Sequence, residues 1–179
     1  MRIIGGEFSG FKIKYPKTRH TRPLTEKCRE AIFNILNNYL KNTYILDLYA
    51  GSGSLGLEAL SRGAKKVIFV DQEKICLLII KRNLKLLNIL EKGKLIRDKV
   101  EKFLSNNKKK FDIIFLDPPW NNLNLVIFPL LKRSLKNEGL VIFCTSKKNE
   151  FLLNTLRDFF IFDKRIYGDH LIVFFKNKK

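Results

Sequence analysis

From residue 44 onward, short apolar runs alternate with longer stretches in which an apolar residue recurs every three or four positions. The short runs are rich in β-branched and aromatic residues and predict strands, whereas the longer periodicity predicts helices with one apolar face. Strands that alternate with helices indicate a mostly parallel sheet with helices on both faces. The predicted strands span residues 45–48, 67–70, 95–96, 113–116 and 140–144, and the predicted helices span 54–61, 72–88, 100–105, 123–135 and 148–156.

Both ends of the chain carry the pattern of a β-hairpin. Residues 1–4 and 11–14 flank a glycine-rich turn, and residues 159–166 and 170–175 flank the turn Tyr167-Gly168-Asp169. The second hairpin would add antiparallel strands to the edge of the sheet. We therefore predict an α/β fold, a doubly wound, mostly parallel, Rossmann-like sheet with a C-terminal antiparallel edge hairpin and a small N-terminal β-hairpin extension.

A helix is predicted between the first hairpin and the sheet. Thr25 is a candidate N-cap, and Glu26 would lie in the first turn. The apolar face of this helix would comprise Cys28, Ala31, Ile32, Ile35 and Leu36. We expect residues 1–24 to form the extension and residues 25–179 to form the main domain.

The composition is that of a soluble globular protein with one domain. Of its 179 residues, 45% are hydrophobic and 29% are charged, and no apolar stretch approaches the roughly 20 residues that span a bilayer. The first six residues lack an apolar signal core, so we expect a cytoplasmic protein. Three widely separated cysteines without metal-ligand spacing predict buried, reduced thiols and no metal site.

The chain is strongly basic. Lys and Arg number 35 against 17 acidic residues, a formal net charge of +18, which favours binding to a polyanion such as nucleic acid. Lys, Ile and Asn are abundant together, as in proteins from AT-rich genomes, so part of this charge has an alternative origin in codon bias. The N-terminal segment holds the candidate RNA contacts Arg2, Lys12, Lys14, Lys17, Arg19 and Arg22.

A glycine loop follows the first predicted strand. Gly51, Gly53 and Gly56 fit the G-x-G-x-x-G pattern between a strand and a helix, where glycines allow a ligand to approach backbone N–H groups. Asp71 ends the next strand, where its carboxylate can accept ribose hydroxyls. These features alone leave a nicotinamide dehydrogenase as an alternative.

Asp47, at the end of the first strand, favours a different cofactor. Its carboxylate would repel the pyrophosphate of a dinucleotide but would stabilise the sulfonium or ammonium of S-adenosylmethionine. The alternative is an aspartate that only caps the loop, and Asp71 could likewise cap the next helix. The candidate cofactor-binding residues are Asp47, Ala50, Gly51, Gly53, Gly56, Asp71, Gln72 and Asp98.

The fourth predicted strand ends in Asp117-Pro118-Pro119-Trp120. Two consecutive prolines end the strand and stiffen the turn, because each ring fixes φ. A carboxylate, a free carbonyl and an aromatic ring on such a turn could hold a flipped-out base that carries an amino group. An ordinary strand end with a core tryptophan is the alternative. If the first and fourth strands are neighbours, Asp47 and Asp117 face each other across the crevice where ligands bind.

These motifs resemble the ribosomal small subunit methyltransferase D family. The resemblance rests on residues 1–6, on Arg22-Pro23-Leu24-Thr25 with Arg29-Glu30 and Phe33-Asn34, on the stretch from Asp47 to Arg62, and on Asp117-Pro118-Pro119. The sequence departs from the family at Trp120, where Tyr or Phe is usual, and at Leu24, where Thr is usual. The region around Asp98 aligns only with a shift of one residue.

The resemblance implies an S-adenosylmethionine-dependent enzyme that methylates N2 of a guanine in 16S rRNA. Asp117, Pro118, Pro119 and Trp120 would be the catalytic residues. The expected partner is 16S rRNA or the small ribosomal subunit particle, the expected oligomeric state is a monomer, and neither a membrane nor a metal is expected. The alternative is an adenine-N6 methyltransferase of RNA or DNA on the same fold.

Overall fold

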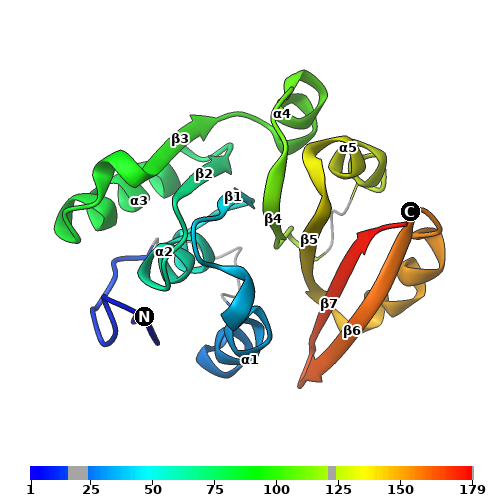
Figure 1. Ribbon diagram of the computed structural model, residues 1–179, viewed down its shortest axis with the longest axis horizontal. Helices are drawn as coiled ribbons and strands as arrows, with labels where there is room; N and C mark the ends of the chain where they lie inside the picture. The colour runs from blue at the N-terminus through cyan, green and yellow to red at the C-terminus, as the bar shows by residue number, and fades with distance from the viewer. Residues whose placement is uncertain (16–23, 121–123, 179) are drawn as a thin grey trace.

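The computed structural model describes residues 1–15, 24–120 and 124–178 (Figure 1). The helices are α1 (Glu26–Leu36), α2 (Ser54–Ser61), α3 (Lys74–Leu86), α4 (Val100–Asn106) and α5 (Ile127–Ser134), with 3-10 helices η1 (Asn37–Tyr39), η2 (Leu90–Lys92) and η3 (Lys147–Thr155). The strands are β1 (Tyr44–Leu48), β2 (Lys66–Asp71), β3 (Gly93–Arg97), β4 (Phe111–Leu116), β5 (Leu135–Ser146), β6 (Phe159–Tyr167) and β7 (His170–Asn177).

The strands form one seven-stranded sheet in the order β3-β2-β1-β4-β5-β7-β6. β1 to β5 pair in parallel, and β7 pairs antiparallel with both β5 and β6. The chain winds outward from β1 in one direction and from β4 in the other, so the topological switch point lies between these two strands. The predicted doubly wound sheet with an antiparallel edge hairpin is confirmed.

Helices cover both faces of the sheet (Figure 1). The apolar sides of α1, α2 and α3 belong to one core cluster, and those of α4 and α5 belong to the other. Alternation along β1 serves both cores, because Ile45 lies in the first cluster whereas Leu46 and Leu48 lie in the second. The inner strands β1, β2 and β4 are therefore buried on both faces, as their continuous apolar runs predict, whereas the edge strands β3 and β6 are partly exposed.

Most elements lie within two residues of their predicted bounds, but three differ by more than that or in type. The helix predicted for residues 123–135 begins at Ile127, and Pro129 explains this, because proline is tolerated only in the first helical turn. β5 extends back to Leu135, which pairs with Phe111 across an irregularity in the ladder. The segment predicted as a helix at 148–156 is the 3-10 helix η3. Residues 121–123 lie outside the described part of the chain.

The N-terminal segment pairs with itself and packs on the main domain. Arg2 and Lys12 form an antiparallel bridge, flanked by a bond from the N–H of Ile3 to the carbonyl of Phe11. Ile3 and Ile13 are buried in the same core cluster as α1, α2 and α3. The hairpin prediction is correct in its pairing, although the pairing is limited to this bridge rather than to two strands.

The three cysteines are buried and unpaired, as predicted. Within the described ranges, none of the helices combines the length and the apolar content that crossing a membrane requires.

Candidate active site

The carboxyl edge of β1 and β4 brings two aspartates together. Asp47 of β1 is in register with Phe115 of β4, Leu48 is in register with Leu116, and Asp117 follows directly. The negative charge of Asp117 is one of the causes that raise the pKa of Asp47, so the two carboxylates interact across this strand pair. The switch point thus places both predicted motifs at one edge of the sheet.

The Asp47 side chain is buried, and one of its oxygens accepts a hydrogen bond of 3.0 Å from the N–H of Gly56. Burial is the main reason why its pKa lies well above the ordinary value, and the charges of Asp117 and Asp71 raise it further. The aspartate therefore joins β1 to the first turn of α2. A positive charge beside these three carboxylates would favour their ionised forms.

The glycine loop is a tight turn with left-handed backbone. Tyr49, Gly51 and Gly53 have φ angles of 56°, 54° and 74°, and the N–H of Gly53 donates to the carbonyl of Ala50 at 2.7 Å. The left-handed region costs about 1–2 kcal/mol for a residue with a Cβ, so Tyr49 marks a strained position at this edge. The N–H of Ala50 donates to Val70 of β2, which fixes the loop to the sheet.

Both carboxylate oxygens of Asp71 accept hydrogen bonds from backbone N–H groups. The N–H groups of Gly51 and Glu73 each donate to it at 2.8 Å, so it joins the glycine loop to the segment that enters α3. Asp71 therefore has a structural role, which was the alternative to cofactor binding. The remaining lone pairs of its carboxylate can still accept hydrogen bonds from hydroxyl groups. Gln72 is exposed, and the N–H of Asp98 donates to the carbonyl of Asp71, which places Asp98 in the neighbouring loop.

Gly56 has a packing role that a substitution would expose. A Cβ there would lie 2.2 Å from Cε1 of Phe69, whereas at Gly51 it would meet only the carbonyl of Tyr49 at 3.8 Å. We expect Gly56→Ala to destabilise the fold by about 3 kcal/mol or more through overpacking. Gly51→Ala is the matched control, limited to a backbone cost of about 1–2 kcal/mol. Urea unfolding measures both, and equal losses would contradict the packing role.

The turn after β4 is held by the 3-10 helix η3 and contacted by β7. The carbonyl of Trp120 accepts a hydrogen bond of 3.1 Å from Nδ2 of Asn149, which also donates to Oγ1 of Thr145 at 2.9 Å. The Trp120 ring is partly exposed and packs edge-on against His170, with ring centroids 4.9 Å apart. Pro118 is buried and Pro119 is exposed. Sequence reasoning missed Asn149 and His170.

Asp117 combines partial exposure with a raised pKa. Desolvation raises the pKa of this carboxyl to about 7. A carboxyl group that titrates near neutral pH can accept a proton as readily as it releases one, which suits general-base chemistry.

A buried carboxylate, also missed from the sequence, holds the N-terminal segment. Glu58 of α2 accepts hydrogen bonds from the N–H groups of Ile4 and Gly5, at 2.7 and 2.8 Å, and from Nε of Arg62 at 2.8 Å. The buried Arg29 lies 3.7 Å from it and donates to the carbonyl of Arg2 at 3.0 Å. The segment is therefore fixed to α1 and α2 by polar contacts as well as by Ile3 and Ile13.

The predicted RNA contacts are exposed where the structure describes them. Arg2 forms an ion pair of 2.8 Å with Glu26, and Lys12 and Lys14 are exposed. The backbone N–H and carbonyl of Lys14 both bond to the side chain of Asn83 on α3, each at 2.9 Å. The remaining candidates, Lys17, Arg19 and Arg22, lie outside the described residues.

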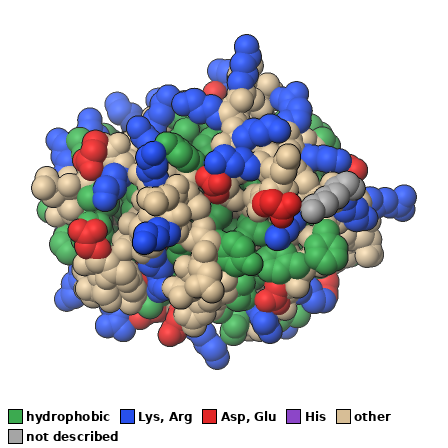
Figure 2. Space-filling view, viewed as in Figure 1, with side chains coloured by type: hydrophobic (Ala, Val, Ile, Leu, Met, Phe, Trp, Pro, Cys, Tyr) green, Lys and Arg blue, Asp and Glu red, His purple; other side chains and the backbone are tan. Residues whose placement is uncertain are grey.

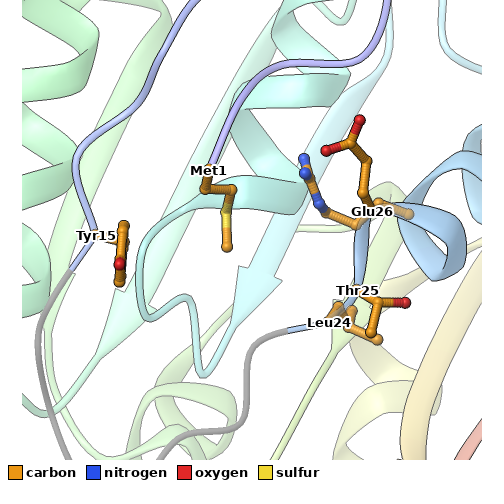
Figure 3. Close-up of a pocket in the computed structure, with 6 residues that line it drawn as sticks. Met1, Tyr15, Leu24, Thr25 and Glu26 are labelled. Atoms are coloured by element: carbon orange, nitrogen blue, oxygen red, sulfur yellow. The ribbon is translucent and has the colours of Figure 1, made fainter.

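A cavity of about 320 Å³ opens between the N-terminal segment and the start of α1 (Figure 3). Met1 and Tyr15 line one side, and Leu24, Thr25 and Glu26 line the other (Figure 3). Oγ of Ser52 lies 3.8 Å from Sδ of Met1, so the cavity adjoins the glycine loop.

Basic side chains occur over the whole visible face, with fewer acidic ones among them (Figure 2). This distribution suits a broad polyanion more than one compact anionic ligand. In the part of the chain that the structure describes, no three His, Cys, Asp or Glu side chains gather as metal ligands.

Comparison with known proteins agrees with this geometry. The chain is 34% identical over 184 residues to "Putative rRNA methyltransferase YlbH" of Bacillus subtilis, an alignment that covers 99% of this chain and 100% of the relative. It is 40% identical over 124 residues to ribosomal RNA small subunit methyltransferase D of Haemophilus influenzae, with 68% of this chain and 64% of the relative covered.

A solved structure shares the whole fold. "Putative methyltransferase yhhF" from Escherichia coli superposes with a TM-score of 0.87 at 27% identity and covers 99% of this chain and 98% of that chain. The fold is thus that of Rossmann-like class I methyltransferases, as predicted. The family described as conserved hypothetical protein 95 matches residues 1–176. This chain therefore belongs to that family, the family of ribosomal RNA small subunit methyltransferase D.

Proposed function

We propose that this protein transfers a methyl group from S-adenosylmethionine to the exocyclic N2 of a guanine in small-subunit ribosomal RNA. The observation that carries this proposal is the pairing of β1 with β4, which sets Asp47 and Asp117 at one edge of the switch point. We further propose that it acts as a monomer in the cytoplasm, on 16S rRNA or on the small-subunit particle.

The carboxyl edge fits a cationic cofactor. Asp47, Asp71 and Asp117 lie close enough for the charges of the other two to raise the pKa of Asp47. At Gly51 a Cβ would meet only the carbonyl of Tyr49, at 3.8 Å, so the loop leaves room for a ligand to approach the backbone. Asp47 would face the cationic end, Asp71 and Gln72 the ribose, and Asp98 the adenine. When bound, S-adenosylmethionine supplies a methyl carbon activated by its sulfonium.

The Asp117 turn would hold the target amine. Guanine presents N1–H and the N2 amino group side by side, and the carboxylate of Asp117 with the carbonyl of Pro118 can accept from both. Trp120 offers a ring on which the flipped base can stack. In the transfer, S-adenosylmethionine would supply the methyl group and leave as the neutral thioether, and Asp117 would take up the proton that the amine nitrogen loses. Much of the acceleration would come from alignment of nitrogen and methyl carbon.

The titration of Asp117 predicts a pH dependence. Its pKa of about 7 means that the carboxylate, the form that accepts hydrogen bonds and a proton, becomes dominant above neutral pH. We expect kcat/KM to rise as pH increases through about 7 and then to level off. Steady-state rates across neutral pH measure this. A profile that is flat through pH 7, or that falls with increasing pH, would contradict the role of Asp117 as a base.

The function is tested with methyl-labelled S-adenosylmethionine and small-subunit rRNA from cells that lack this protein. We expect the label to be transferred to rRNA in small-subunit particles. We expect mass spectrometry of the product to identify the modified base as N2-methylguanine. Label on adenine N6, or transfer to DNA in preference to rRNA, would replace this proposal with the adenine alternative. The absence of any transfer to nucleic acid would reject it.

A further inference from the structure

The 3-10 helix η3 has two distinct sides. With three residues per turn, side chains three positions apart lie above one another. Asn149 and Leu152 form the inner side, where Leu152 is buried. Lys148, Phe151 and Asn154 form the outer side, and all three are exposed. Phe151 is 64% exposed, a large apolar surface left in water.

The inner side of η3 joins this helix to the proposed base clamp. The amide of Asn149 donates both to the carbonyl of Trp120 and to the hydroxyl of Thr145 at the end of β5. Oγ of Ser146 accepts from the N–H of Lys148, and the N–H of Lys147 donates to the carbonyl of Asp169 at 2.8 Å. Both ends of this first turn are therefore fixed. Phe151 follows Asn149 by two residues on η3, which begins where β5 ends, at the same edge of the sheet as the turn after the parallel strand β4.

The charges around Phe151 favour an anionic partner. Lys147 lies 3.9 Å from Asp169, and Glu150 is paired with Lys164, which leaves these acids neutralised. Lys148 forms no ion pair within the described ranges of the chain. The outer side thus offers one aromatic ring and one uncompensated cation, the groups that bind the base and the phosphate of single-stranded RNA.

We propose that the outer side of η3 binds the nucleotide next to the target guanine, with Phe151 stacked on its base and Lys148 against its phosphate. This inference rests on the proposed function and takes the target guanine to lie in a single-stranded segment of the RNA, where the neighbouring base is free to stack on an aromatic side chain. It adds a second RNA contact on the opposite end of the chain from the basic N-terminal segment.

The test compares Phe151→Ala and Lys148→Ala with matched controls in methyl transfer to protein-free rRNA and to small-subunit particles. Phe160→Ala on β6 removes a ring that is 57% exposed, and Lys85→Ala removes an exposed lysine of α3. We expect Phe151→Ala to raise the KM for RNA about five- to 150-fold, as the loss of one base stack would. Phe151→Tyr should restore it, and the Kd for S-adenosylmethionine and the melting temperature should not change.

Lys148→Ala should reduce the slope of log affinity against log salt concentration by about 0.7, the value for one phosphate of a single strand. Unchanged KM in Phe151→Ala, or an equal change in Phe160→Ala, would overturn the inference. An effect confined to particles, while protein-free rRNA keeps its wild-type KM, would also overturn it, because the occupant would then be a ribosomal protein. Failure of the wild-type protein to methylate rRNA would instead reject the proposed function, and this inference with it.

Discussion

Asp117→Asn is expected to lower the rate of methyl transfer about a hundredfold to ten-thousandfold, the usual contribution of a positioned base. Asparagine keeps the shape of the side chain but cannot take up the proton of the reacting amine. Its NH₂ group is a hydrogen-bond donor and would face the N–H donors of guanine, with which it cannot bond. Rates at saturating S-adenosylmethionine and RNA measure the loss. Asp117→Ala should likewise abolish turnover while donor binding remains nearly intact.

The Asp117→Asn substitution should also make the protein more stable at neutral pH. The pKa of Asp117 in the folded protein, about 7, lies above the ordinary value of 3.8, so the native state binds this proton more tightly than the unfolded chain does. That stabilisation is complete below pH 3.8 and is lost as pH rises to about 7. A neutral asparagine removes this dependence. We expect a higher melting temperature for Asp117→Asn at pH 7.5 and above.

Asp158→Asn is the control, because Asp158 is exposed and lies in a surface ion pair with Lys132. It should change neither rate nor stability. Equal losses of donor binding and turnover in Asp117→Asn would argue that Asp117 holds the cofactor rather than the base. A lower melting temperature would contradict the unfavourable burial of its charge.

Glu58→Ala is expected to lower the free energy of unfolding by about 3–5 kcal/mol, because it breaks a buried ion pair and leaves its partners unpaired. The N–H groups of Ile4 and Gly5 would lose their acceptor, and the buried guanidinium of Arg29 would lose its compensating charge. Urea unfolding measures the change. Proteolysis should also show earlier cleavage in the N-terminal segment, which these contacts fix.

Glu26→Gln tests whether burial is the reason. Glu26 also binds the N-terminal segment, through Arg2, but both side chains of that pair are exposed. An exposed pair contributes little, so the urea midpoint should hardly move. If Glu58→Ala and Glu26→Gln shifted the midpoint equally, the anchoring role of the buried carboxylate would be wrong.

The features that local pattern could predict are those set by near neighbours in the chain. The bounds of α2, residues 54–61, were predictable because a glycine loop precedes it and a periodic apolar run fills it. The proximity of Asp47 and Asp117 was predictable only on the condition that the first and fourth strands are neighbours, as in one of the common orders of doubly wound sheets, and the strand order meets that condition. The predicted start of α5 at residue 123 is wrong, because Pro129 is tolerated only in the first helical turn and therefore sets the start of the helix at Ile127.

The features that escaped depend on contacts between distant segments. Glu58 bonds to groups 53 and 54 residues away, and Asn149 bonds to Trp120 across 29 residues. A signal for Glu58 did exist, because a carboxylate within the apolar run of α2 must find partners when it is buried. Arg29 carried the same signal beside Cys28. No local pattern indicated that Trp120 would pack on His170.

Helix α2 touches both ends of the proposed reaction site. In its first turn, the N–H of Gly56 donates a hydrogen bond to Asp47. Further along the helix, the side chains of Glu58 and Ser61 accept hydrogen bonds from the N-terminal segment. Eight residues span only about 12 Å, and so short a helix behaves as one stiff body. The glycine loop and the N-terminal segment are thereby coupled mechanically, so a displacement of one would be transmitted to the other through α2.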